Sequence, residues 1–222
     1  MKYDHKRGLY LPEGKILKGR PTELMQVGPN FYSGGAAAAS GGFDPLYVPA
    51  NYTLSNGNTT VSSTSAFANS SVLSLNTHNS GKYYFEFAFN NYLFNSIGIN
   101  NDVKSTAVNS QVGDTVHSWG WFNQNNTYHS GSTTAYGPGG TNGMVLGCAI
   151  DWAAGKIWWS KNNVWVNSGD PAAGTNPAYT GQTFGTAYIA VNLYNGSPTS
   201  GTCKFTSASL TYAPPSGFSA WE

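Results

Sequence analysis

Hydrophobic and polar positions alternate along two adjacent stretches in the middle of the chain. The first stretch ends at Asp151, a short turn closes at Gly155, and the second stretch runs from Lys156 to Lys161 into Asn162-Asn163. Gly and Asn tolerate the positive φ angles that tight turns require. Because Ile and Trp recur at every second position, the segment from Gly147 to Trp165 predicts a β-hairpin whose aromatic face is buried by a second sheet.

The two faces of this hairpin carry different side chains. By alternation, Ile157 and Trp159 share one face, while Lys156, Trp158 and Ser160 share the other. Trp158 is therefore either an outward ring or a residue covered by a neighbouring segment.

The same period of two recurs from about Tyr47 to the end of the chain, between turns rich in Gly, Asn and Ser. No long segment has helical periodicity, so we expect an all-β fold of two stacked antiparallel sheets. The predicted strands are Tyr52–Leu54, Thr59–Ser62, Ser71–Leu75, Lys82–Phe89, Ser96–Asn100, Trp119–Phe122, Met144–Asp151, Lys156–Lys161, Ala187–Leu193 and Thr202–Thr206.

The composition of the chain agrees with a folded β-protein and argues against a disordered, membrane-spanning or secreted chain. Charged residues make up 9% of the chain and aromatic residues 14%, which is unlike a disordered segment. No stretch has the length of a membrane-spanning helix, and no apolar segment near the start is typical of a signal peptide. We therefore expect no membrane insertion and synthesis in the cytoplasm of the producing cell.

The first 45 residues differ from the rest. Residues 1–20 carry six basic and two acidic side chains, a net charge of +4, whereas the rest of the chain carries five Lys and eight acids, a net charge of −3. This contrast predicts an irregular N-terminal arm that docks on an acidic surface, with a solvated terminus as the alternative. The Gly/Ala-rich tract 33–42 is interpreted as a connector. The basic residues of the predicted anchoring arm are Lys2, Lys6, Arg7, Lys15, Lys18 and Arg20.

The two cysteines, Cys148 and Cys203, both fall in predicted strands with apolar neighbours. A disulfide scaffold of this length would carry more pairs, so buried free thiols are favoured, although pairing stays open. Neither cysteine has the spacing or the histidine neighbours of a metal site, and no metal or cofactor is expected.

Six segments follow one another along the chain in a recognisable order. They are the hairpin from Leu54 to Asn58, the strand from Ser80 to Phe87, the strand from Ser96 to Ile99, and the segments Gly143–Asp151, Gly155–Trp165 and Pro214–Phe218. In this order they resemble the SPRY family, over about residues 46–221. The resemblance implies a concanavalin-like bent antiparallel β-sandwich over 46–222 that acts as a non-catalytic recognition module. The segment 165–181 is similar to the variety found in bacteriophage tail and other virion proteins, which implies a phage particle as the setting.

The sequence offers little catalytic chemistry. It contains no G-x-S-x-G elbow, and its four histidines are scattered. A glycosidase needs two facing carboxylates, but no strand carries alternating acids. We expect the Glu86 carboxylate to accept hydrogen bonds from neighbouring backbone or hydroxyl groups. We expect Asp151 to be a turn residue that closes the hairpin. A nucleic-acid reader would need basic residues across one face, and the body has only five lysines.

What remains is binding by the loops of the sandwich. The most loop-like aromatic segment runs from Trp119 to Tyr136, and its rings and amides suit sugars and protein hot spots equally well. Burial of Trp119 or Trp121 in the core is the alternative for those two rings, whereas exposure is expected for Tyr128, His129 and Tyr136. The candidate ligand-binding residues are Trp121, Asn125, Tyr128, His129 and Tyr136.

Together these features predict a non-enzymatic bacteriophage virion protein. In this hypothesis the SPRY-like body is displayed on a tail or fibre for receptor binding or host adhesion, and residues 1–45 anchor it to other virion proteins. Its ligand would be a host-surface glycan or protein, and several copies would assemble on the particle. The alternative is a purely structural capsid or tail decoration protein. A cellular SPRY adaptor that binds a peptide fits the Asn/Thr/Gly-rich composition less well.

Overall fold

The computed structural model describes residues 2–4, 9–11, 41–64, 69–91, 95–122, 125–137, 139–193 and 199–222. The chain divides into two units, residues 1–37 and residues 38–222. In the first unit, β1 (Lys2–Asp4) pairs antiparallel with β2 (Leu9–Leu11), so the segment expected to be irregular contains a small two-stranded sheet. Apart from Lys2, the predicted anchoring residues Lys6, Arg7, Lys15, Lys18 and Arg20 lie outside the described residues.

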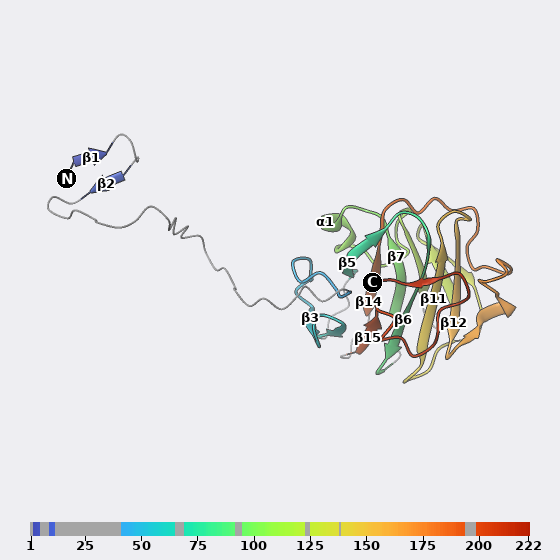
Figure 1. The fold of residues 1–222 in the computed structure, drawn as a ribbon. Helices are drawn as coiled ribbons and strands as arrows, with labels where there is room; N and C mark the ends of the chain where they lie inside the picture. Colours follow the sequence, from blue (N-terminus) through green and yellow to red (C-terminus); the bar gives the residue numbers. More distant parts are fainter. Residues whose placement is uncertain are drawn as a thin grey trace. The chain divides into compact units, whose positions relative to one another are not determined.

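The second unit is a sandwich of two sheets that pack face to face (Figure 1). One sheet has the strand order β10-β9-β8-β7-β14-β5 and is antiparallel throughout. Its strands are β5 (Val72–His78), β7 (Asn95–Asn100), β8 (Ser118–Phe122), β9 (Asn126–His129), β10 (Ser132–Ala135) and β14 (Ala187–Leu193).

The other sheet has the order β13-β12-β11-β6-β15-β4-β3, and β16 adds a short parallel pairing to β6. Two short helices complete the described residues, α1 (Lys104–Ala107) and the 3-10 helix η1 (Val166–Ser168). The strands of this sheet are β3 (Tyr52–Ser55), β4 (Thr60–Ser63), β6 (Lys82–Phe89), β11 (Val145–Asp151), β12 (Lys156–Lys161), β13 (Val164–Trp165), β15 (Ser200–Lys204) and β16 (Ser219–Ala220). The all-β sandwich is thus confirmed, with strand bounds within three residues of the predicted ones.

The core lies between the sheets, where alternate side chains of facing strands meet. Phe85 and Phe87 of β6 and Ile157 and Trp159 of β12 point into it, as the period of two predicts. Burial of such rings supplies the main favourable free energy of folding. Both cysteines are buried and free, which confirms the expectation of unpaired thiols.

The outer face of the larger sheet is also covered. Trp158 is fully buried there against Tyr84 and Phe218, so its ring is covered and does not face solvent. Its Nε1–H donates to the Thr175 carbonyl oxygen at 2.7 Å. The segment after β15 therefore completes the domain by closing over this outer face.

Glu86 holds that closing segment in place. Its carboxylate is fully buried and accepts hydrogen bonds from the backbone N–H groups of Thr211 (2.7 Å) and Tyr212 (2.9 Å) and from the Tyr84 hydroxyl (3.0 Å). Lys204 Nζ lies 4.0 Å away. The expected structural role of Glu86 is confirmed.

The sandwich begins before residue 46. Phe43 is buried in the core and packs edge-on against Phe205, with ring centroids 5.3 Å apart. Asp44 N–H donates to the Leu73 carbonyl oxygen and Leu75 N–H to that of Gly42, both at 2.8 Å. Residues 41–44, assigned from sequence to the N-terminal arm and connector of residues 1–45, therefore extend the six-stranded sheet beyond β5.

Candidate functional site

The predicted binding segment is a meander of three strands, not a loop. In β8 and β9, Trp119 pairs with His129, Gly120 with Tyr128 and Trp121 with Thr127. Paired residues share one face of a sheet, and successive residues alternate between faces. The candidate side chains are consequently divided between the core face and the outer face.

Two of the five candidates are core residues. Trp121 is 1% exposed and Tyr136 is 7% exposed, so the expectation of an exposed Tyr136 is wrong. The inward face of the meander buries both rings, and the Tyr136 hydroxyl points to the Val166 carbonyl oxygen at 3.4 Å. The alternative of burial holds for Trp121. Neither side chain is placed to contact a ligand.

The other three candidates lie apart from one another. Asn125 is exposed at the turn before β9. Tyr128 lies on the outer face, where its hydroxyl donates to Asp114 Oδ1 at 2.8 Å, and burial together with the Asp114 carboxylate raises its pKa to about 12. His129 lies on the inward face at the end of β9 and stacks on Trp119 with centroids 5.0 Å apart. Only His129 borders the cluster described next.

Polar and aromatic groups gather instead at one end of the sandwich, which we call the loop end. It consists of residues 101–102, 115–118, 152–155 and 179–186, which follow or precede core strands. These residues lie directly at strand ends, and the sheet gives them a rigid frame. The backbone pairing of β7 and β8 continues into the loop end, where Asn101 N–H donates to the His117 carbonyl oxygen at 2.8 Å.

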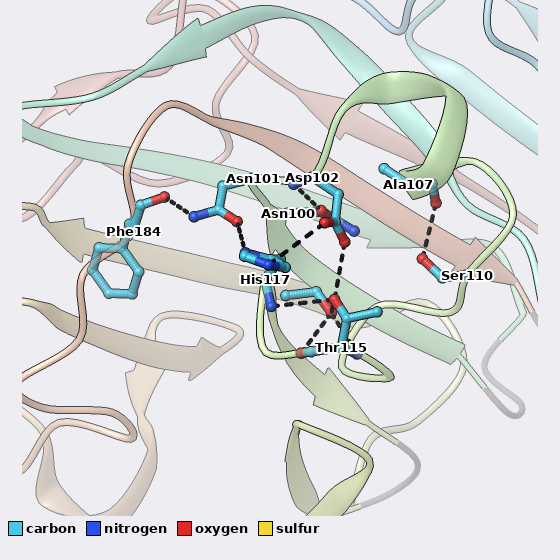
Figure 2. Close-up of polar contacts among 9 residues, drawn as sticks. Asn100, Asn101, Asp102, Ala107, Ser110, Thr115, His117 and Phe184 are labelled. Atoms are coloured by element: carbon cyan, nitrogen blue, oxygen red, sulfur yellow. Dashed lines mark hydrogen bonds and ion pairs between the residues drawn. The ribbon is translucent and has the colours of Figure 1, made fainter.

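Figure 2 shows how Asn101 connects two loops of this end. Its Nδ2 donates to the Phe184 carbonyl oxygen at 2.6 Å, and its Oδ1 lies 2.9 Å from His117 Nδ1. Because an amide oxygen accepts, His117 carries a proton on Nδ1. Asn101 thereby fixes both the ring orientation and the tautomer of His117.

His117 also faces a carboxylate. Its Nε2 lies 3.9 Å from Asp102 Oδ1, and its side chain is 53% exposed. The Thr115 hydroxyl donates to Asp102 Oδ2 at 3.0 Å (Figure 2). Since this hydroxyl is directed at the carboxylate and not at the imidazole, the arrangement is not a nucleophile–base pair of the kind that catalysis requires. It exposes the imidazole to solvent, with the amide and the carboxylate partly buried beside it.

Aromatic rings support the polar groups. Trp119 Nε1–H donates to Gln182 Oε1 at 2.9 Å, and the half-buried Trp152 donates its Nε1–H to the Gly185 carbonyl oxygen at 2.9 Å. Phe184 lies between these two rings, at 5.1 Å from Trp119 and 5.8 Å from Trp152. The loop 179–186 is therefore held at Gln182 and at Gly185 by indole hydrogen bonds.

Sequence reasoning missed four residues of the loop end, namely Asn101, His117, Trp152 and Gln182. They come from four separate segments, and only the pairing of distant strands brings them together. The one local signal was the polar doublet Asn101-Asp102 directly after a buried strand. Among the described residues, no group of three or more His, Cys, Asp or Glu side chains could hold a metal ion.

Comparison with known proteins gives the family. The SPRY domain family model matches residues 82–205, from the first residue of β6 to the residue after β15, which is more than half of the chain. The chain belongs to the SPRY domain family. SPRY domains are generally non-catalytic binding modules, and the exposed groups of the loop end agree with such a role.

Solved structures show the same fold. The comparison found 232 matching chains, among them the stonustoxin structure, to which this SPRY domain is 21% identical with a TM-score of 0.56. The match covers 73% of this chain and 26% of the stonustoxin chain, and at this identity it shows a shared fold alone. The search of curated proteins gave no match. Within the described residues, no helix is long and apolar enough to cross a membrane.

Proposed function

We propose that this SPRY domain is a recognition module displayed on a bacteriophage particle, where it binds a glycan of the host surface through the loop end. The observation that carries the proposal is the exposed His117 on a rigid frame, next to the partly buried Asn101, Gln182 and Trp152. Indole rings cover the apolar face of a sugar, and amide and imidazole groups bond its hydroxyls.

The phage setting rests on sequence. The segment 165–181 is similar to the virion variety of SPRY domain, and the charge of the body is low and net acidic. Residues 1–45 carry the basic charge that would attach the domain to other virion proteins in several copies. The competing function is a structural capsid or tail decoration, in which the arm docks and the loop end binds nothing.

A binding comparison tests the proposal. Purified full-length chain is applied to immobilised host envelope glycans, next to the double variant N101A/H117A and the control V164A. Val164 is 71% exposed and follows β12 at the end opposite the loop end, so its loss leaves the site intact. We expect about a tenfold or greater loss of affinity for N101A/H117A and none for V164A.

Three outcomes contradict the proposal. Equal binding by both variants would remove the loop end as the site. Binding that survives deglycosylation of the envelope and is lost on proteolysis would make the ligand a protein. No binding by the parent chain would favour the decoration role.

A further inference from the structure

β10 is an edge strand with an open outer side. It lies at one end of the six-stranded sheet and, among the described strands, pairs only with β9. All four of its residues, Ser132 to Ala135, are exposed, and none is charged or proline. Natural edge strands usually carry a charge, a proline or a bulge that prevents pairing with another chain. The opposite edge, at β5, is closed by residues 42–44.

The turn before β10 determines which backbone groups face outward. Ser130 and Gly131 have φ angles of 51° and 70°, the positive pair of a two-residue hairpin turn. Two contacts show which residues of β10 form hydrogen-bonded pairs with β9. Ser132 pairs with His129 next to the turn, and Tyr136 N–H donates to the Asn125 carbonyl oxygen at 2.6 Å. Hydrogen-bonded and non-hydrogen-bonded pairs alternate between these two positions. The N–H and C=O groups of Thr133 and Ala135 therefore point away from β9, and none of the described residues pairs with them.

We infer that β10 pairs antiparallel with β10 of a second copy of this chain about a two-fold axis. In the register that uses all the outward groups, Thr133 lies opposite Ala135 of the second copy, and four backbone hydrogen bonds form. Thr134 then lies opposite its own equivalent, on the axis. The two six-stranded sheets become one continuous sheet.

The strand itself favours a second copy over a foreign strand. Its two outward-facing residues, Thr133 and Ala135, are two positions apart, so the reversed strand presents a matching set of donors and acceptors. The strand has no charge that would be repelled by its own image, and facing Thr residues are a favourable cross-strand pair. Such a contact is small, so it is weak in solution and gains from the high local concentration of many copies.

Disulfide trapping tests the register. In full-length chain, T134C places two thiols at a non-hydrogen-bonded pair with Cα atoms about 4.5 Å apart, within disulfide range. The matched control is T133C, equally exposed on the same strand, whose two copies lie more than about 7 Å apart. The native Cys148 and Cys203 are buried and do not compete. We expect about tenfold more covalent dimer from T134C, and equal yields would overturn the inference.

Introducing a charge at position 134, on the two-fold axis, gives a second test that does not depend on oxidation. Lys or Glu at position 134 faces itself in the second copy, so T134K and T134E should each lose self-association in sedimentation at high protein concentration. An equal mixture of the two should restore a heterodimer. Self-association of T134K alone at the parent level, or a parent chain that stays monomeric and gives no T134C dimer, would overturn the inference. Neither result depends on what the loop end binds.

Discussion

At the scale of single residues, Glu86 stabilises the fold most directly. Replacing it with Gln introduces an N–H donor where the backbone N–H groups of Thr211 and Tyr212 and the Tyr84 hydroxyl all donate. We expect E86Q to lower the free energy of unfolding by about 2–3 kcal/mol in urea titration, because buried donors lose an ionised acceptor. The exposed Asp170 gives the control D170N, with a loss below about 1 kcal/mol. Equal losses would contradict the role of Glu86.

His78 makes the stability depend on pH. Its Nε2–H donates to the Trp221 carbonyl oxygen at 2.8 Å, and its ring stacks on Tyr83 with centroids 3.5 Å apart. Burial lowers the pKa of His78 below its ordinary value of 6.5, although the bond to Trp221 opposes this. Between the two pKa values the unfolded chain binds more protons than the folded chain, so the stability from His78 is complete above pH 6.5 and declines as the pH falls below it.

The melting temperature between pH 8 and pH 5 measures this effect. Between pH 8 and pH 5, the melting temperature of the parent chain should decrease by more than that of the variant H78Q, because H78Q has no titrating ring at this position. The exposed, non-titrating Val164 provides the control V164A, which should follow the parent. Parallel curves for the parent and H78Q would show that another group carries the pH dependence.

At the scale of elements, the pairing of β7 with β8 supports the loop end. Gly98 and Gly120 face each other across this pair. A Cβ at Gly98 would overlap the backbone oxygen of Trp119, whereas a Cβ at Gly120 would meet Ser96 Oγ and Val112 Cγ1 at 3.0 Å. We expect G98A to destabilise the domain by about 3 kcal/mol or more and G120A by less, measured by urea unfolding. The reverse order would contradict the described register.

The elements also show where sequence reasoning succeeds. The β11–β12 hairpin was predicted because Ile and Trp contrast sharply with the polar residues between them. In β9 and β10 the alternating residues are almost all polar, so the period of two carries no hydrophobic contrast and the segment was interpreted as a loop. Burial of Trp121 and Tyr136 follows from that pairing, which is not visible in the local pattern.

At the scale of the whole molecule, the fold was predictable and the candidate site largely was not. Family resemblance and alternation are local properties, and both point to the sandwich. The loop end forms because His117, Trp152 and Gln182, from distant segments, are joined by hydrogen bonds to other loops. Of the predicted ligand residues, only His129 borders it, through its stacking on Trp119.

The division of the chain predicts the effect of truncation. Removing residues 1–37 leaves Phe43 and the strand pairing of residues 42–44 in the sandwich, so the melting temperature should change by less than about 3 °C. Removing residues 1–45 deletes Phe43 and should destabilise the domain measurably.

The truncation of residues 1–37 also tests the anchor, because it should abolish incorporation in particle-assembly assays. Full incorporation of the folded truncation would contradict the proposed anchor.

The most direct test of the central claim is to map the bound ligand on the protein. Amide chemical shifts of labelled full-length chain are recorded as a host-surface glycan is added. We predict the largest changes in residues 101–102, 115–118 and 179–186 and in the indole N–H of Trp152, with none in residues 161–168 at the opposite end. Shifts confined to residues 161–168, or to residues 207–217 of the segment after β15 that closes over the outer face of the larger sheet, would contradict the loop end as the binding surface.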